Sequence, residues 1–485
     1  MNKAIGKLEL SIFALFGAVT ITSILVALGT GLHYIALIPF GLMLIYTGII
    51  NFKILYYLLL FTIPFSIEYS FSGSLGTDLP DEPMMIGLMA VTIIYLGSNY
   101  RALPTGYFAN FLILALIAHI FWIFLSATNS IHFVVSLKQF LAKLWYVITF
   151  GVLTAVIIRT KEDLKKAFWC IYIPLTLLMV QVVIRHAMQG FSFEDINRPM
   201  YPFFRNHVNY AAIVSIFFPF LILARTWYPN SFYKRQLLNF SILFYIVAIY
   251  LSYTRTCYLA LLMIYPFYLV IKHKWIKPAL LVLSIAVTFF VVHIFHENKF
   301  LQYSPEYSET IYHDDFTEHL SSTFAGKDVS SMERVYRWVA VTNMFKDHPY
   351  MGFGPGNFYP YYQRYTLSDF ETYVSDNPER STAHDYFLLL LAEQGVIGLA
   401  VFLFLTAVIF IYGEKIYHRM VDKSDKMIVL TLLLVIATVY VNLLLSDLLE
   451  SDKVGPFFFF CIALLAAWDI KSRKAAPALL NTQGQ

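Results

Sequence analysis

The sequence is poor in charge. Only 14% of its 485 residues are Asp, Glu, Lys or Arg, whereas 58% are apolar. A soluble domain carries about 25% charged residues, so this composition excludes a soluble globular enzyme and a disordered tail protein. The net charge of +4 is small, and the basic residues form no stripe that could follow a phosphate backbone. That argues against a nucleic-acid-binding protein.

Cysteine is equally scarce. The three cysteines, Cys170, Cys257 and Cys461, each lie inside an apolar run, and the chain contains no CxxC pair. This count and spacing argue against a disulfide framework and against a cysteine-based zinc site.

Long apolar segments are what the sequence has in abundance. About 14 of them reach or approach the length of ~20 residues that crosses a bilayer as a helix. They are 9–28, 33–50, 53–67, 84–99, 108–127, 139–158, 166–185, 207–224, 236–253, 257–271, 277–296, 384–412, 427–446 and 455–470. Two or three are short enough to be re-entrant, so we predict an all-α transmembrane bundle of 12–14 spans. The first segment follows Lys3 and Lys7 but lacks a cleavage site, and we predict a retained helix.

Basic clusters recur on alternate connections between these segments. The positive-inside rule places such connections, and with them both termini, in the cytoplasm. Lys138 and Lys143 are exceptions, since they fall near the outer face. The clusters are Arg159/Lys161/Lys165/Lys166, Arg225/Lys234/Arg235, Lys272/Lys274/Lys277, Lys415/Arg419/Lys423/Lys426 and Lys471/Arg473/Lys474.

One outer connection, residues 297–383, is far longer than any other and holds 13 acidic and 7 basic residues. Its many aromatic residues indicate a folded segment, and the amphipathic spacing from Met332 to Phe345 predicts a helix at the membrane surface. We therefore divide the chain into an N-terminal transmembrane bundle (1–296), a long periplasmic loop (297–383) and C-terminal transmembrane helices with a short cytoplasmic tail (384–485).

Arginines collect at the outer ends of the predicted helices. A charge at the bilayer centre costs about 2.5–3.5 kcal/mol, so charges near it deserve a functional interpretation. A single arginine at the outer face more often binds lipid headgroups than forms part of a functional site. Several outer arginines on separate loops together predict a binding site for an anionic group such as pyrophosphate. The candidates are Arg205, Arg255, Arg334 and Arg337, followed by Arg185, Arg198, Arg364 and Arg380.

His384 opens the helix that follows the long loop. An imidazole at a membrane boundary can act as a general base, and nearby arginines would keep it neutral by lowering its pKa. The alternative is a histidine that bonds to a backbone group at the helix start. Asp385 is adjacent but points about 100° away on a helix, so we predict that it favours the helix N-terminus instead of orienting His384.

Three weaker patterns remain. The glycine-rich stretch 352–358 could hold phosphate through its amides, although a tight turn is favoured. Two acidic groups could bind a divalent cation, but neither has a ligand spacing, and we predict solvated loops for both. They are Asp78/Asp81/Glu82 and His313/Asp314/Asp315/His319.

The segments MERVYRWVAVTNMFKDHPYMGFGPGNF and AHDYFLLLLAEQGVIGL resemble the O-antigen ligase and polymerase superfamily of membrane glycosyltransferases. SYTRTC resembles the family segment that carries Arg255 here, and RNHVNYAA resembles another, with Arg205 just ahead. Asp385 and Leu399 depart from the ligase motif. The residues that match the signature are Arg334, Trp338, His348, Pro349, Gly352, Gly354, His384, Glu393, Gly395 and Gly398.

The resemblance implies a multi-pass enzyme of lipopolysaccharide biosynthesis in the bacterial inner membrane, with its active site facing the periplasm. Its donor would be a glycan on undecaprenyl pyrophosphate. The four arginines Arg205, Arg255, Arg334 and Arg337 would hold the pyrophosphate, and His384 would take the proton of the acceptor hydroxyl. The reaction would invert the anomeric carbon and need no metal or other cofactor. Trp338, Gly352, Gly354, Gly395 and Gly398 would be structural.

The leading hypothesis is an O-antigen ligase, whose acceptor is the sugar core of lipid A. The alternatives within the class are a repeat-unit polymerase of O-antigen or exopolysaccharide and a protein O-oligosaccharyltransferase. The rival from another class is a transporter of the same lipid-linked glycan. A transporter favours repeated halves and charges near the middle of spans, and the sequence shows neither.

Overall fold

The computed structural model describes residues 7–72, 75–295, 329–367 and 381–482. In this part of the chain, ten helices are long and apolar enough to cross a membrane. The strands β1 (Ile67–Ser72) and β2 (Leu75–Leu79) form one antiparallel hairpin in which Ile67 lies opposite Leu79. The predicted all-α polytopic bundle is therefore confirmed.

The helices follow the apolar segments of the sequence. In chain order they are α1 (Lys7–Thr30), α2 (Ile38–Thr62), α3 (Asp81–Ser98), α4 (Phe111–Thr128), α5 (Phe133–Tyr146), α6 (Thr154–Ile157), α7 (Lys161–Met188), α8 (His207–Thr226), α9 (Phe232–Tyr250), α10 (Arg255–Lys272), α11 (Ile276–Phe295), α13 (Val329–Asp347), α14 (Phe358–Tyr362), α15 (Tyr386–Arg419), α16 (Lys423–Leu443) and α17 (Gly455–Thr482). A π-helix, Val147–Leu153, joins α5 to α6.

Two predicted segments, 33–50 and 53–67, meet in α2. The helix is interrupted at Asn51, whose backbone is not helical (φ −152°, ψ 81°). The helices α1, α3 and α9 also follow predicted spans, but they are not among the ten helices that are long and apolar enough to cross a membrane. The helix predicted from the spacing of 332–345 is present as α13.

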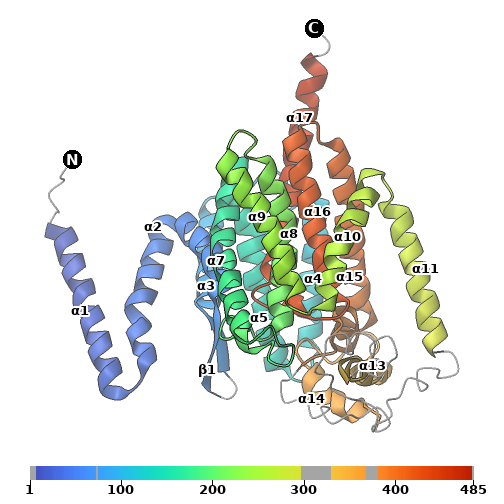
Figure 1. Ribbon diagram of the computed structural model, residues 1–485, viewed down its shortest axis with the longest axis horizontal. Coiled ribbons are helices and arrows are strands. Elements are labelled where there is room, and N and C mark those ends of the chain that lie inside the picture. The colour runs from blue at the N-terminus through green and yellow to red at the C-terminus, as the bar shows by residue number, and fades with distance from the viewer. Residues whose placement is uncertain (1–6, 73–74, 296–328, 368–380, 483–485) are drawn as a thin grey trace.

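The centre of the bundle is formed by α8, α16 and α17. Their most apolar windows are 78%, 89% and 83% buried, whereas that of α11 is only 6% buried. Residues 427–443 are apolar on nearly every side of the helix, a pattern typical of a helix that is surrounded by others. Figure 1 shows α11 and α1 at the periphery.

The two ends of the bundle differ in character. Figure 1 shows that α1 begins and α17 ends on the same side as the α8–α9, α10–α11 and α15–α16 connections. Ion pairs join Lys161 to Asp422 at 2.5 Å and Lys471 to Asp425 at 3.1 Å there. We call this the basic end. The opposite end, the loop end, carries the β-hairpin, α13 and α14, and α13 crosses the direction of the bundle helices (Figure 1).

Lys143, an exception to the orientation rule, has a structural partner. Its side chain is buried, and Nζ lies 2.7 Å from Oε1 of Glu450 in the α16–α17 connection. Glu450 also accepts hydrogen bonds from Gln139 at 2.6 Å and Tyr386 at 3.1 Å. Because its charge is neutralised locally, Lys143 does not contribute to the basic clusters that set orientation.

The acidic group near Asp81 is not a solvated loop, so that prediction was wrong. Asp81 is fully buried, and Asp452 is 5% exposed. Lys453, which is under the electrostatic influence of both carboxyl groups, donates to the carbonyls of Ile63, Pro64 and Ser66 at 3.0–3.2 Å, just after the end of α2. A lysine at this place satisfies the last carbonyls of a helix and balances the buried carboxylates.

In the described residues, no group of three or more His, Cys, Asp or Glu is placed to hold a metal ion. The second acidic group, His313/Asp314/Asp315/His319, lies outside the described residues.

Replacing Lys453 with methionine is expected to destabilise the protein by about 3–5 kcal/mol, the usual cost of removing one partner from a buried charge cluster. The carbonyls of residues 63–66 lose their donor, and Asp81 and Asp452 lose a counter-charge. The measurement is the thermal unfolding temperature in detergent. Lys277→Met, an exposed lysine at the basic end, is the control. Equal unfolding temperatures for the two variants would contradict the prediction.

Candidate functional site

His384 lies at the loop end, between the long loop and α15, in a left-handed backbone conformation (φ 52°) that non-glycine residues seldom adopt. The chain just before it is held by α13. Trp338 Nε1 donates to the Ala383 carbonyl at 3.0 Å, and Arg337 Nη1 donates to the Thr382 carbonyl at 3.3 Å. These two bonds stabilise the strained conformation from one side.

On its other side, His384 is followed by the N-cap of α15. The Asp385 side chain accepts a hydrogen bond from the Leu388 amide at 2.8 Å. The prediction that Asp385 serves the helix N-terminus is confirmed.

The surroundings of His384 favour the neutral imidazole. Burial, followed by the positive charges of Arg337 and Arg334, lowers the pKa of His384 to about 3. At neutral pH the ring therefore carries no charge, and one of its nitrogens keeps a free lone pair.

Both α13 arginines that the sequence singled out thus act on His384. Arg337 is buried, and its Nη2 lies 3.4 Å from Oε2 of Glu333, one turn earlier on the same helix. Arg334 is half-buried and lies three positions before Arg337. Since Arg337 is buried and bonds to Glu333 and to the Thr382 carbonyl, its geometry suits positioning, whereas Arg334 is the more accessible cation.

Arg205 is connected to this site through Asp447, a carboxylate in the α16–α17 connection. Burial raises the pKa of Asp447, while the Thr382 hydroxyl and the Arg205 charge oppose that rise. Asp447 is therefore near both Arg205 and the residue that lies two positions before His384. The structure brings together four elements here: the loop before α8, the α16–α17 connection, α13 and the start of α15.

Arg255 is the first residue of α10, at the loop end. Its neighbours place it beside the start of α8 and the end of α16. Thr254 Oγ1 donates to the His207 carbonyl at 3.5 Å, and Cys257 Sγ lies 3.3 Å from Asn442 Oδ1. Arg255 thus shares an end of the bundle with His384.

The secondary arginine candidates have local contacts. Arg185 donates to the carbonyls of Pro199 and Tyr201, which ties the end of α7 to the following loop. Arg364 lies over the Tyr361 ring, 5.6 Å from its centre. Arg198 belongs to a short 3₁₀ turn, and Arg380 lies outside the described residues.

The glycine motif joins α13 to α15. α15 is interrupted at Gly395 (φ 66°, ψ −173°), and residues 349–354 pair with the break. Phe353 and Gly354 donate their amides to the carbonyls of Ala392 and Glu393 at 3.0 and 2.7 Å, and Val396 donates to the Pro349 carbonyl at 2.8 Å. Because these amides already have partners, the structure favours the tight turn over a phosphate cradle.

Close backbone approach explains why glycine occupies two of these positions. A Cβ on Gly352 would lie 2.3 Å from the Glu393 carbonyl carbon, and one on Gly395 would lie 2.3 Å from the Tyr350 carbonyl. Gly354 approaches Ser130, and Gly398 approaches Gln394 and Trp122 almost as closely. The motif therefore fixes where α13 packs along α15, and with it the position of the arginines beside His384.

Three supporting residues, Ser126, Asp447 and Glu450, were not found from the sequence. Ser126 of α4 donates to the Met351 carbonyl at 3.0 Å. Glu393, which the resemblance did include, accepts from the Phe358 amide at 3.1 Å. Asp447 and Glu450 did leave a signal, because SDLLESDK places carboxylates in a short link between two spans. Ser126 left none, since its contacts depend on how α4 packs against α15.

Residues 240–403 match the family model described as O-Antigen ligase. This match supports the O-antigen ligase superfamily for that segment of the chain. No curated protein matches the chain. The matched segment runs from α9 into α15 and includes Arg255, Arg334, Arg337 and His384, whereas Arg205 and Asp447 lie outside it. The match, together with the many apolar helices, supports a multi-pass membrane protein of ligase or polymerase type with lipid-linked glycan substrates.

The low pKa of His384 predicts a pH-dependent stability. The unfolded chain binds a proton at His384 below about pH 6.5, whereas the native state does so only near pH 3. The native state therefore loses stability as the pH falls, by about 1.4 kcal/mol per unit and about 2 kcal/mol by pH 5. His384→Gln is expected to remove this contribution. Unfolding temperatures at pH 7.5 and 5 should diverge between wild type and variant, while His273→Gln should follow wild type. Parallel curves for His384→Gln would refute the assignment.

Proposed function

We propose that the chain is an O-antigen ligase. It transfers a glycan from undecaprenyl pyrophosphate to a sugar hydroxyl of the lipid A core, at the periplasmic face of the inner membrane. The observation that carries the proposal is a neutral histidine, His384, held beside Arg334 and Arg337 at the end of the bundle opposite the basic connections. A base next to fixed cations suits the transfer of a group from an anionic leaving group.

In the proposed reaction, His384 accepts the proton of the acceptor hydroxyl as its oxygen attacks the anomeric carbon. The bond from that carbon to the pyrophosphate oxygen breaks, and the electron pair leaves with the pyrophosphate. Arg334, Arg205 and Arg255 neutralise the departing charge, so the leaving group needs no proton. A single displacement inverts the anomeric carbon. Arg337 positions the segment before His384, and Asp447 positions Arg205.

A repeat-unit polymerase is the second candidate. Asp385 stands where the ligase motif has Asn, Ser or Gln, and Leu399 stands where it has Thr. Both enzymes use the same donor and the same base, and they differ in the acceptor. The site described here supports the shared chemistry equally for both.

The test is a strain that lacks the native gene, with and without the wild-type chain, analysed by lipopolysaccharide gels stained for glycan. A ligase predicts that the null strain accumulates polymeric glycan on undecaprenyl pyrophosphate and that the chain restores it to the lipid A core. A single repeat on the core of the null strain identifies a polymerase. Glycan missing from proteins identifies a protein transferase, and donor retained on the cytoplasmic leaflet identifies a transporter.

A further inference from the structure

The basic end of the bundle contains a cavity far from His384. Its volume is about 330 Å³, and its walls are the α3–α4 connection, the end of α6 and the last turns of the membrane part of α17. Three lining residues are cationic and none is acidic. The cations are Arg101, Arg159 and Lys471, and much of the remaining wall is apolar, with Ile158, Ile470 and Trp468.

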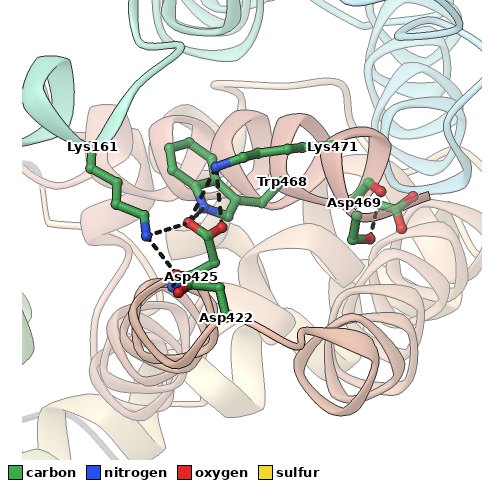
Figure 2. A network of polar contacts seen from close by, with 7 residues as sticks. Lys161, Asp422, Asp425, Trp468, Asp469 and Lys471 are labelled. Atoms are coloured by element: carbon green, nitrogen blue, oxygen red, sulfur yellow. Dashed lines mark hydrogen bonds and ion pairs between the residues drawn. The ribbon is translucent and has the colours of Figure 1, made fainter. Parts of the chain in front are cut away.

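The lysine of this cavity is balanced, as Figure 2 shows. Lys471 Nζ lies 3.1 Å from Asp425 Oδ2, and Asp425 lies 3.4 Å from Lys161, which in turn pairs with Asp422. Trp468 donates its indole N–H to Asp425 at 3.1 Å. The positive charges of two lysines are thus balanced by the negative charges of two aspartates in this network.

The two arginines are not balanced. Arg159 donates to the carbonyls of Val156, at 2.9 Å, and Ala102, and Arg101 donates to the Tyr100 hydroxyl at 3.1 Å. Among the described residues, neither guanidinium forms an ion pair with a carboxylate. The cavity mouth therefore presents two exposed positive charges that no carboxylate of the described residues neutralises, and an anionic group could bind there.

A second hollow is lined by residues that follow or precede the cavity residues closely in sequence. It has a volume of about 330 Å³, it lies between α4 and the α5–π-helix segment, and all of its exposed lining is apolar. It begins at Tyr107, Phe108 and Val152, close in sequence to the cavity residues Thr105 and Ala155, and reaches Phe124. The π-helix widens the backbone here, and its Gly151 carbonyl accepts a hydrogen bond from the Tyr107 hydroxyl.

We propose that these two hollows form one binding site for an anionic phospholipid of the leaflet at the basic end. The phosphate binds between Arg101 and Arg159, and an acyl chain lies in the apolar groove beside α4. Cationic pockets between transmembrane helices bind anionic headgroups, and the paired guanidinium forks match phosphate oxygens. Trp468, which is buried with its indole N–H bonded to Asp425, forms part of the cavity wall. The site is independent of the proposed glycan transfer, because it lies at the opposite end from His384.

The experiment is native mass spectrometry of the full-length protein in neutral detergent, titrated with phosphatidylglycerol or phosphatidylcholine. Wild type is expected to bind phosphatidylglycerol at least about tenfold more tightly, since each charge-assisted phosphate bond contributes about that factor. The double variant Arg101→Gln/Arg159→Gln should lose this preference. The matched control is Lys234→Gln/Arg235→Gln, which removes two exposed charges at the same end but outside the cavity, and it should retain the preference.

A second variant tests the groove without changing charge. Ile117→Trp fills the hollow beside α4 and should weaken phosphatidylglycerol binding several-fold. This variant keeps the proposal testable even if the double arginine variant does not fold. Equal binding of the two lipids, equal losses in the control variant, or no effect of Ile117→Trp would overturn the proposal. Inorganic phosphate that competes as well as the lipid would identify a site for free anions and would overturn it too.

Discussion

Replacing His384 with alanine is expected to reduce glycan transfer by about 10²–10⁴-fold, the usual contribution of a general base. The imidazole is neutral at pH 7 because burial and two arginines lower its pKa, and the adjacent carboxylate of Asp385 is occupied as the N-cap of α15. The measurement is the initial rate of transfer from a purified lipid-linked glycan to its acceptor by reconstituted protein.

The control for this prediction is His273→Ala, a histidine just after α10 at the opposite end of the bundle. It should leave the rate unchanged. Both variants should keep the unfolding temperature of wild type at pH 7.5, which separates a chemical defect from a structural one. If His384→Ala transfers glycan at the wild-type rate, His384 is not the base and the proposed mechanism is wrong.

Replacing Gly395 with alanine is expected to disrupt the junction between α13 and α15. The new Cβ would lie 2.3 Å from the Tyr350 carbonyl, and the backbone there has φ +66°, which L residues rarely adopt. Neither backbone can yield without breaking the bonds from Phe353 and Gly354 to α15. We expect a loss of more than about 3 kcal/mol, in the range that only severe core or backbone strain produces.

Thermal unfolding in detergent measures this loss, and proteolysis of the 349–358 region reports whether the turn has detached. Gly87→Ala is the matched control, because a Cβ at that helical position meets nothing within 4 Å. It should be neutral or slightly stabilising, since alanine favours helix over glycine by about 1 kcal/mol. Wild-type stability of Gly395→Ala would show that the break in α15 does not fix α13.

The sequence indicated the positions of the helices more accurately than the breaks and turns that connect them. Residues 427–446 are so uniformly apolar that a buried span was predictable, and α16 occupies that place. The break of α15 at Gly395 was not predicted, because residues 384–412 form one long segment that is apolar apart from a few residues such as Glu393 and Gln394, and helices tolerate such residues. Only the turn 349–354, which supplies the missing hydrogen bonds, makes the break stable.

The candidate site shows the same division. His384, Arg334 and Arg337 were predictable because they lie in one short stretch with motif spacing, and the structure places both arginines in the surroundings of the histidine. Asp447 was not predicted, because the carboxylates that SDLLESDK places in a short link between two spans do not reveal which of them faces the site. Its role follows from Thr382 and Arg205, which approach it from distant parts of the chain.

What the sequence determined by itself is that this is a helical membrane protein with its charge at the ends of the helices. A bilayer penalises each exposed charge and each unpaired backbone group locally, so hydropathy along the chain suffices. Only the tertiary structure decided which charges pair. Lys143 with Glu450 and the unbalanced Arg101 and Arg159 depend on which helices are neighbours. In a medium that screens charge weakly, the distance between two side chains decides whether a charge forms an ion pair within the protein or is left to bind an external ion, and only the packing of the helices sets that distance.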